Sequence, residues 1–183
     1  MAEHEPCIGK SDEWYTPEDF LNRIVQALGA PFDLDPCNHG RRDHHVPARR
    51  VLTKADDGLT SPWRKGEIVF MNPPFGGREG HLPWLARFFE HRNGIAVVRA
   101  YTSSRWWHSH IFPQAETILF PKGKTKFVYP DRDTNKLRVG GSPGHGVALI
   151  GMGEASNAAL RACGLGEVWD RTASAATTDG GRE

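Results

Sequence analysis

The stretch Glu67-Ile68-Val69-Phe70-Met71-Asn72-Pro73-Pro74-Phe75-Gly76-Gly77 joins a short apolar run to two consecutive prolines. The apolar run predicts a buried strand, and the prolines end it because they remove two consecutive backbone N–H donors. Open α/β sheets bind their ligands at the carboxyl ends of their strands. The polar residues that follow this strand are therefore candidates for a ligand site.

The Asn-Pro-Pro corner, Asn72–Pro74, has a defined hydrogen-bonding capacity. A residue before proline is excluded from the α region, so the Asn72 amide and the Pro73 carbonyl project past the strand end as two neighbouring acceptors. Phe75 adds an aromatic face. Two acceptors and a ring suit a planar base that carries an exocyclic amino group and is lifted out of a duplex. A Pro-Pro pair also occurs as a simple turn, but its position after a buried strand favours the ligand site.

Length and composition indicate a soluble α/β protein of one domain, because 183 residues can bury a sound core and 25% of them are charged. No apolar run has the length of a membrane span and Met1–Lys10 is polar, which predicts a cytoplasmic location, with no membrane partner. The cysteines are odd in number and widely spaced, which predicts free thiols. They are Cys7, Cys37 and Cys163.

The net charge of +1 does not by itself indicate a nucleic-acid partner. Any contact with DNA must come from local basic clusters, and each cluster is alternatively a solvated surface patch. The clusters are Arg41-Arg42, Arg49-Arg50 and Lys122–Lys126.

A helix is predicted after Thr16, which can cap it, with Pro17 at its first position and Gly29 closing it. The apolar residues between them recur at helical spacing. The pair Trp14-Tyr15 lies just ahead of the cap. These two aromatics either form a hydrophobic staple or line a ligand site.

Pro31–Asn38 predicts a second strand that ends in an acidic corner at Asp35 and Pro36. A carboxylate there can accept hydrogen bonds from a ligand, or can stabilise an Asp-Pro turn. Nearby Cys and His side chains match no standard zinc spacing, which favours a surface loop without metal. They are Cys37, His39, His44 and His45.

A third polar group is expected at the same sheet edge. Asp56-Asp57-Gly58-Leu59 forms an acidic turn after the short strand Val51–Thr53 and shortly before the Asn-Pro-Pro corner. Asp57 either binds the amino group of a cofactor adenine or caps the turn with its side chain.

Helix and strand patterns alternate through the rest of the chain. Thr102-Ser103-Ser104 is predicted to cap a helix in which one residue of Trp106-Trp107 belongs to the core, while the other, with Arg105, meets a phosphate or a base. Polar, glycine-rich residues 131–144 predict no strand. The further predicted elements are helices near 82–89, 105–112 and 155–163 and strands at 95–101, 117–120, 124–129 and 146–152.

The order of short motifs resembles the phage-type, Dam-like DNA N6-adenine methyltransferases, which belong to the class I S-adenosylmethionine-dependent methyltransferases. Several short motifs in the family's order are more specific than any one of them. The motifs are Asp12-Glu13-Trp14-Tyr15-Thr16-Pro17, Leu34-Asp35-Pro36-Cys37, Asp56-Asp57-Gly58-Leu59, Asn72-Pro73-Pro74-Phe75, Thr102-Ser103-Ser104-Arg105-Trp106 and Lys122-Gly123-Lys124-Thr125-Lys126-Phe127.

The resemblance implies a single-domain Rossmann-like fold: a mostly parallel sheet flanked by helices, with antiparallel strands near the C-terminus. It also implies roles for individual residues. The implied catalytic residues are Asn72, Pro73, Pro74 and Phe75. Those implied for S-adenosylmethionine are Trp14, Thr16, Pro17, Asp35, Pro36, Asp57 and Gly58. Those implied for DNA are Arg105, Trp106, Lys122, Lys124 and Lys126.

The activity implied by the resemblance is methylation of adenine N6 in DNA by a phage or prophage protein without a metal or an obligate protein partner. The expected organisation is a flexible segment 1–11, a methyltransferase domain 12–165 with small recognition insertions at about 105–145, and a disordered tail 171–183. Two alternatives stay open, namely methylation of RNA adenine or protein glutamine, and a catalytically silent DNA-binding relative. One departure is the segment Asp35–Gly40, which stands where larger adenine methyltransferases carry a glycine-rich loop.

Overall fold

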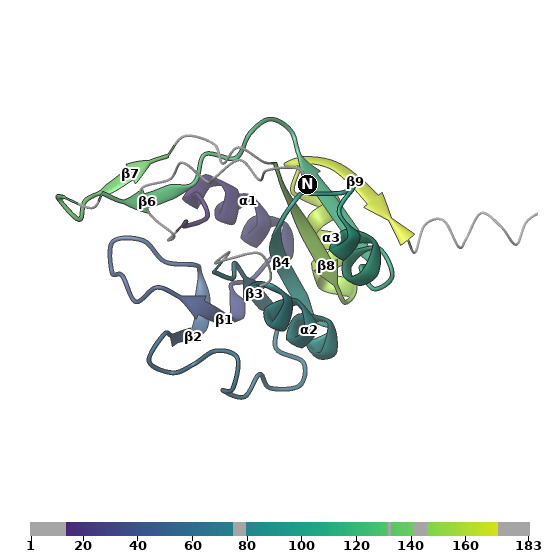
Figure 1. The fold of residues 1–183 in the computed structure, drawn as a ribbon, viewed down its shortest axis with the longest axis horizontal. Helices are drawn as coiled ribbons and strands as arrows, with labels where there is room; N and C mark the ends of the chain where they lie inside the picture. Colours follow the sequence, from purple (N-terminus) through teal and green to yellow (C-terminus); the bar gives the residue numbers. More distant parts are fainter. Residues whose placement is uncertain (1–13, 75–79, 132, 141–145, 172–183) are drawn as a thin grey trace, which may run out of the picture.

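A seven-stranded sheet forms the centre of the molecule (Figure 1). The computed structural model describes residues 14–74, 80–131, 133–140 and 146–171. The strands lie in the order β2-β1-β3-β4-β8-β5-β9. Their bounds are β1 Phe32–Asn38, β2 Ala48–Thr53, β3 Val69–Met71, β4 Gly94–Arg99, β5 Thr117–Pro121, β8 Val147–Met152 and β9 Gly166–Asp170.

The sheet is parallel on one side and antiparallel on the other. β2, β1, β3 and β4 pair in parallel, whereas β8 runs antiparallel between β4 and β5, and β9 runs antiparallel to β5. The predicted α/β sheet with antiparallel strands near the C-terminus is therefore confirmed. The carboxyl ends of β1, β3 and β4 lie at one edge of the sheet, which brings the segments that follow these strands together.

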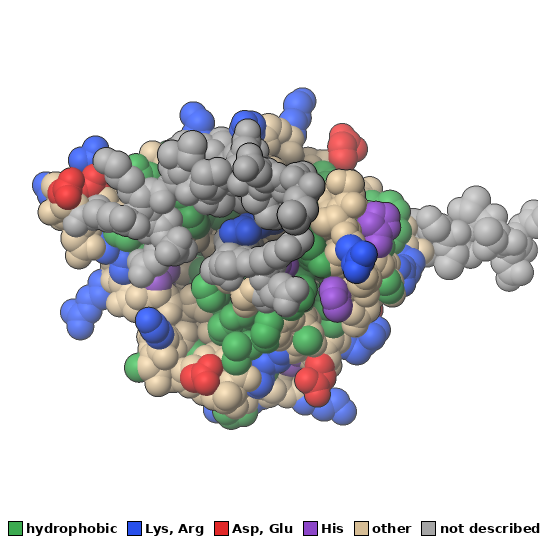
Figure 2. All heavy atoms as spheres, in the orientation of Figure 1, with side chains coloured by type: hydrophobic (Ala, Val, Ile, Leu, Met, Phe, Trp, Pro, Cys, Tyr) green, Lys and Arg blue, Asp and Glu red, His purple; other side chains and the backbone are tan. Residues whose placement is uncertain are grey.

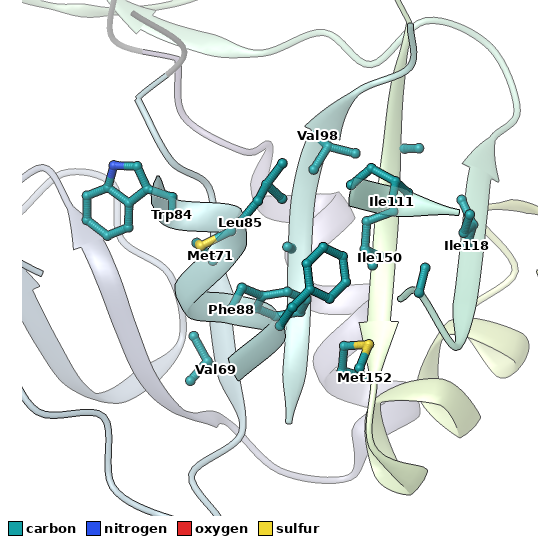
Figure 3. Packing of buried hydrophobic residues seen from close by; sticks show 14 of the residues in the cluster. Val69, Met71, Trp84, Leu85, Phe88, Val98, Ile111, Ile118, Ile150 and Met152 are labelled. Atoms are coloured by element: carbon teal, nitrogen blue, oxygen red, sulfur yellow. The ribbon is translucent and has the colours of Figure 1, made fainter. Parts of the chain in front are cut away.

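Helices cover both faces of the sheet. Helices α1, Glu18–Leu28, and α3, Glu154–Ala162, pack on one face, and α2, Leu82–His91, packs on the other. Neighbouring residues of β3 divide between these layers: Phe70 faces the α1 side, while Val69 and Met71 lie under α2 (Figure 3). This two-sided burial explains the continuous apolar run in the sequence.

The start of α1 differs from the prediction. Pro17 occupies the N-cap and no side chain caps the helix, so the capping role predicted for Thr16 is wrong. Backbone hydrogen bonds in both directions between Tyr15 and Val128 fix the entry to the helix, and Thr16 is buried there. Its hydroxyl oxygen has no partner among the described residues. Gly29 closes the helix in the left-handed region, as predicted.

The segment after β4 is wound more loosely than the predicted helix. Arg105 and Trp106 are helical, but Trp107–Ile111 forms a π-helical turn. The Ser104 hydroxyl donates to the Tyr101 carbonyl rather than capping the turn, so the predicted cap is wrong. The Trp107 side chain is fully buried, and its indole N–H donates to the Arg99 carbonyl at 2.7 Å.

Two strands lie where none was predicted. β7, Leu137–Val139, pairs with β6, Val128–Pro130, in a hairpin that extends away from the main sheet (Figure 1). The predicted strand at 124–129 is thus shorter and shifted, and residues 131–144 are not all irregular. β9 forms the edge of the main sheet. In the described part of the chain no helix is long and apolar enough to span a membrane.

Candidate active site

Asn72 is held in one orientation at the carboxyl end of β3. Its side-chain N–H donates to the Trp14 carbonyl at 2.7 Å. Because that carbonyl only accepts, the amide nitrogen must face it, and Oδ1 points away from it. Asn72 Oδ1 is buried, and no described residue donates a hydrogen bond to it. A fixed, desolvated acceptor of this kind favours a ligand that brings an N–H group.

Pro73 and Pro74 follow Asn72 in the chain. Pro73 is buried and Pro74 is exposed. Neither has an N–H, so this stretch of backbone offers ligands only acceptors. Phe75, which the sequence predicts to stack on the base, lies outside the described residues.

Asp35 is a buried carboxylate in β1, the strand next to β3, and only 3% of its surface is exposed. The pairing of β1 with β2 shifts register between Asp35 and Asn38, an irregularity that accommodates Pro36 within a strand. Asp35 accepts hydrogen bonds from the Asn38 side chain and the Cys37 N–H. Burial raises the pKa of Asp35 to about 6, and these two hydrogen bonds lower it in part.

The loop at Asp57 and Gly58 packs directly against the Asp35 corner. A Cβ atom on Gly58 would lie 1.9 Å from the Pro36 carbonyl oxygen, so only glycine fits. The Asp57 carboxylate accepts from the Leu59 N–H at 3.1 Å and from the Thr60 hydroxyl at 2.9 Å. These contacts match the turn-capping role that the sequence allowed. The contact of Asp57 with a cofactor stays a prediction.

The N-terminal aromatics connect the Asn-Pro-Pro corner to the hairpin. Trp14 packs against Phe127 and Tyr129, with ring centroids 6.5 and 5.5 Å apart. The next residue, Tyr15, is buried and stacks on His39 at 3.7 Å. Trp14 therefore both packs as a core residue and holds the Asn72 amide through its carbonyl.

Trp106, one of the residues predicted to contact DNA, lies on the segment that follows β4. It is half-buried, and its ring and the His81 ring pack in a T-shaped arrangement with centroids 4.6 Å apart. Arg105 beside it is exposed. His81 was missed from the sequence, where a single histidine between a glycine-rich loop and a helix carries no pattern.

The three predicted DNA-contacting lysines, Lys122, Lys124 and Lys126, lie together elsewhere. All three are exposed and line an open cavity of about 610 Å³ beside the first turn of α1, which Pro17 and the buried His44 also line. None of the three forms an ion pair with another described residue. Asn72, Asp35 and Asp57 do not line this cavity. The lysine segment is thus a separate candidate surface.

Most of the predicted site residues fall into two groups, while Arg105 and Trp106 lie apart on the segment after β4 and Pro17 lines the lysine cavity. One group gathers at the carboxyl edge of β1 and β3, where Trp14 binds Asn72 and Gly58 packs on Pro36. The other contains the three lysines. No cluster of three or more His, Cys, Asp or Glu side chains suited to a metal occurs in the part of the chain that the structure describes.

The first group contains two buried acceptors, the Asp35 carboxylate and Asn72 Oδ1. An adenosine-containing ligand carries hydroxyl and amino donors, and the buried Asp35 carboxylate is an acceptor for them next to the cradle formed by Gly58 and Pro36. The unpaired Asn72 Oδ1 on the neighbouring strand is a separate acceptor for a second ligand. These two acceptors are chemically compatible with a hydroxyl- or amino-bearing cofactor at β1 and an amino-bearing ligand at β3.

Comparison with known proteins gave one match, to a family. No curated protein and no solved structure matched the chain. One family did: the family model described as DNA N-6-adenine-methyltransferase (Dam) matches residues 7–151, which include every element from α1 to β7 and most of β8. This protein therefore belongs to the DNA N-6-adenine-methyltransferase (Dam) family.

Proposed function

We propose that this protein transfers a methyl group from S-adenosylmethionine to N6 of an adenine in DNA. The observation that carries the proposal is the buried, unpaired Oδ1 of Asn72, whose orientation the Trp14 carbonyl fixes. Membership of the Dam family supports DNA adenine as the acceptor. The resemblance of the sequence motifs also leads us to expect a phage or prophage origin.

Asn72 and Pro73 activate the amino group by accepting its two protons as hydrogen bonds. The nitrogen of adenine is a poor nucleophile because its lone pair is delocalised into the ring. Acceptance by Asn72 Oδ1 and the Pro73 carbonyl favours the pyramidal geometry in which that lone pair is available. Both acceptors are held before the base arrives, so alignment supplies much of the acceleration. Phe75 would hold the base by stacking.

S-adenosylmethionine supplies an electrophilic methyl group on a sulfonium sulfur. In our proposal it is held by the β1 corner, Asp35 and Pro36, by the loop Asp57-Gly58 that packs on this corner, and by the segment Trp14–Pro17. The Asp35 carboxylate accepts hydrogen bonds from the ligand's hydroxyl groups. The bound cofactor and the base would then meet between the adjacent strands β1 and β3.

DNA would be held by charge at several places rather than by one large surface. On the face shown in Figure 2, the Lys and Arg side chains of the described residues are scattered and form no single continuous patch. This distribution agrees with the net charge of +1. We assign backbone contacts to Arg105 and to the three lysines that line the cavity beside α1, and a base contact to Trp106.

The proposal is tested by incubating the protein with labelled S-adenosylmethionine and unmethylated bacterial or phage DNA, followed by nucleoside analysis. We expect label in N6-methyladenine. Label on cytosine alone, or none on single- or double-stranded DNA, would contradict the proposal. RNA and protein competitors in the same reaction separate the other acceptors. A silent DNA-binding relative would bind S-adenosylmethionine in calorimetry without methylating any of them.

A further inference from the structure

His81 is a buried polar side chain whose two ring nitrogens both lack a partner. Only 4% of its surface is exposed, and neither Nδ1 nor Nε2 forms a hydrogen bond within the described residues. Buried side-chain nitrogens are nearly always hydrogen-bonded, because an unpaired one loses its interaction with water without replacement. Among the described residues, both ring nitrogens of His81 are therefore available to a ligand.

The fold places His81 at the same sheet edge as Asn72. His81 is the N-cap residue of α2, and the first turn of that helix, with Trp84 and Leu85, packs over Met71, the residue before Asn72 (Figure 3). From the other side, Trp106, which follows β4, packs against the His81 ring. His81 and Trp106 thus connect the segments that follow β3 and β4, and β3 ends at the Asn-Pro-Pro corner.

His81 presents one donor and one acceptor because it is neutral. Burial lowers the pKa of His81, and the positive charge of Arg99 and the nearby His110 lower it further. A neutral imidazole carries a proton on one nitrogen only. A ligand at this position therefore meets one N–H donor and one lone pair, beside the Trp106 ring that packs on His81.

A flipped adenine has hydrogen-bonding groups besides its amino group, and these groups also need partners in the protein. In our proposal Asn72 Oδ1 and the Pro73 carbonyl take both amino protons, and the ring nitrogens N1, N3 and N7 of the base are acceptors. A donor is required for them. One of the two Asn72 amide hydrogens is used by Trp14, whereas the His81 ring has no hydrogen-bond partner among the described residues.

We propose that His81 donates a hydrogen bond to a ring nitrogen of the target adenine, and that Trp106 forms the wall of the pocket behind it. This inference rests on the proposed function and adds a base-recognition residue to it. Neither residue is needed for binding the methyl donor at Asp35. His81 therefore acts on the affinity and placement of the base, not on the cofactor.

Replacing His81 with leucine tests this role, since leucine fills a similar volume without hydrogen-bonding atoms. We expect kcat/KM for DNA to fall about ten- to a hundredfold, as for a lost hydrogen bond in a buried site. The calorimetric affinity for S-adenosylmethionine should stay unchanged. The melting temperature should stay equal or rise, because an unpaired polar group leaves the interior.

Two further variants complete the experiment. His81→Gln keeps a side-chain N–H and should recover a large part of kcat/KM. If the leucine variant does not fold, the glutamine variant alone tests the role of His81. His108→Ala, an exposed histidine on the same segment as Trp106, is the matched control and should behave as wild type. A structural histidine would instead show a lower melting temperature in both His81 variants and no rescue by glutamine.

The outcomes separate this inference from the proposed function. If the wild-type protein methylates adenine and His81→Leu stays within about twofold of it, the role of His81 is refuted and the function stands. If the wild-type protein methylates no adenine, both are overturned. Loss of activity in His81→Leu with recovery in His81→Gln supports both.

Discussion

In the proposed mechanism single residues carry the chemistry, and the fold leaves these residues polar, buried and incompletely hydrogen-bonded. Asn72 Oδ1 and His81 are buried without partners among the described residues, and Asp35 is a buried carboxylate. Such groups cost stability in the free protein. They lie at the carboxyl ends of neighbouring parallel strands, or on the helix that packs against these ends. A ligand bound at this position would supply the missing hydrogen bonds.

The pKa of Asp35 predicts how cofactor binding depends on pH. The carboxylate form accepts hydrogen bonds, and burial raises its pKa to about 6. Protonation below that value removes acceptor capacity, so affinity for S-adenosylmethionine should be constant above about pH 7 and fall about tenfold by about pH 5. Calorimetry across this range measures the change. If the affinity does not vary with pH, the assignment of Asp35 to the cofactor site is contradicted.

Gly58 predicts a second effect at the residue scale. In Gly58→Ala the new methyl group would collide with the backbone oxygen of Pro36, which cannot move without disturbing β1. We expect a loss of about 2 kcal/mol or more of unfolding free energy and weaker cofactor binding. Denaturant unfolding and calorimetry check these effects.

Gly146→Ala is the matched control for this substitution. There the added atom would meet the Ala100 side chain at 3.7 Å, an ordinary contact. Its stability should stay within about 1 kcal/mol of wild type. Equal stability of the two variants would contradict the close packing of the loop on β1.

Elements with strong periodicity were predicted correctly from the sequence, and those without it were not. The apolar runs of β3, β4 and β8 and the amphipathic faces of α1 and α2 are distinct enough to identify these elements from the sequence alone. β7 and β9 are short and partly exposed, so their pairing partners, not their composition, make them strands. The π-helical turn at Trp107 likewise involves a contact outside the turn, the hydrogen bond from the Trp107 indole N–H to the Arg99 carbonyl.

The segment Lys122–Lys126 leads to a prediction at the element scale. Replacing Lys122, Lys124 and Lys126 by glutamine should weaken DNA binding at all sequences and reduce the salt dependence of log K by up to about three units, near one per phosphate contact. S-adenosylmethionine affinity should not change. Binding titrations at several salt concentrations measure the slope.

A double variant of Lys54 and Lys65, both exposed and outside this segment, is the control. It should keep the wild-type salt dependence. If the triple variant also keeps the wild-type slope, the lysines beside α1 do not contact phosphates.

At the scale of the whole molecule, the site is made by contacts that no local pattern contains. Asn72 and Trp14 are 58 positions apart, yet one hydrogen bond joins them. The sequence predicted that several strand ends would meet at one edge, but the order of the strands and the insertion of β8 between β4 and β5 follow from long-range pairing. For the same reason His81 and Trp106 were not predicted to meet.

The most direct test of the central claim, that Asn72 orients the amino group of DNA adenine, compares N6-methyladenine formation by wild type and Asn72→Ala. The account predicts at least about a hundredfold lower kcat for the variant, with unchanged affinity for S-adenosylmethionine. Asn22→Ala, on the exposed face of α1, should retain full activity. If the Asn72→Ala variant methylates adenine at the wild-type rate, the account is contradicted.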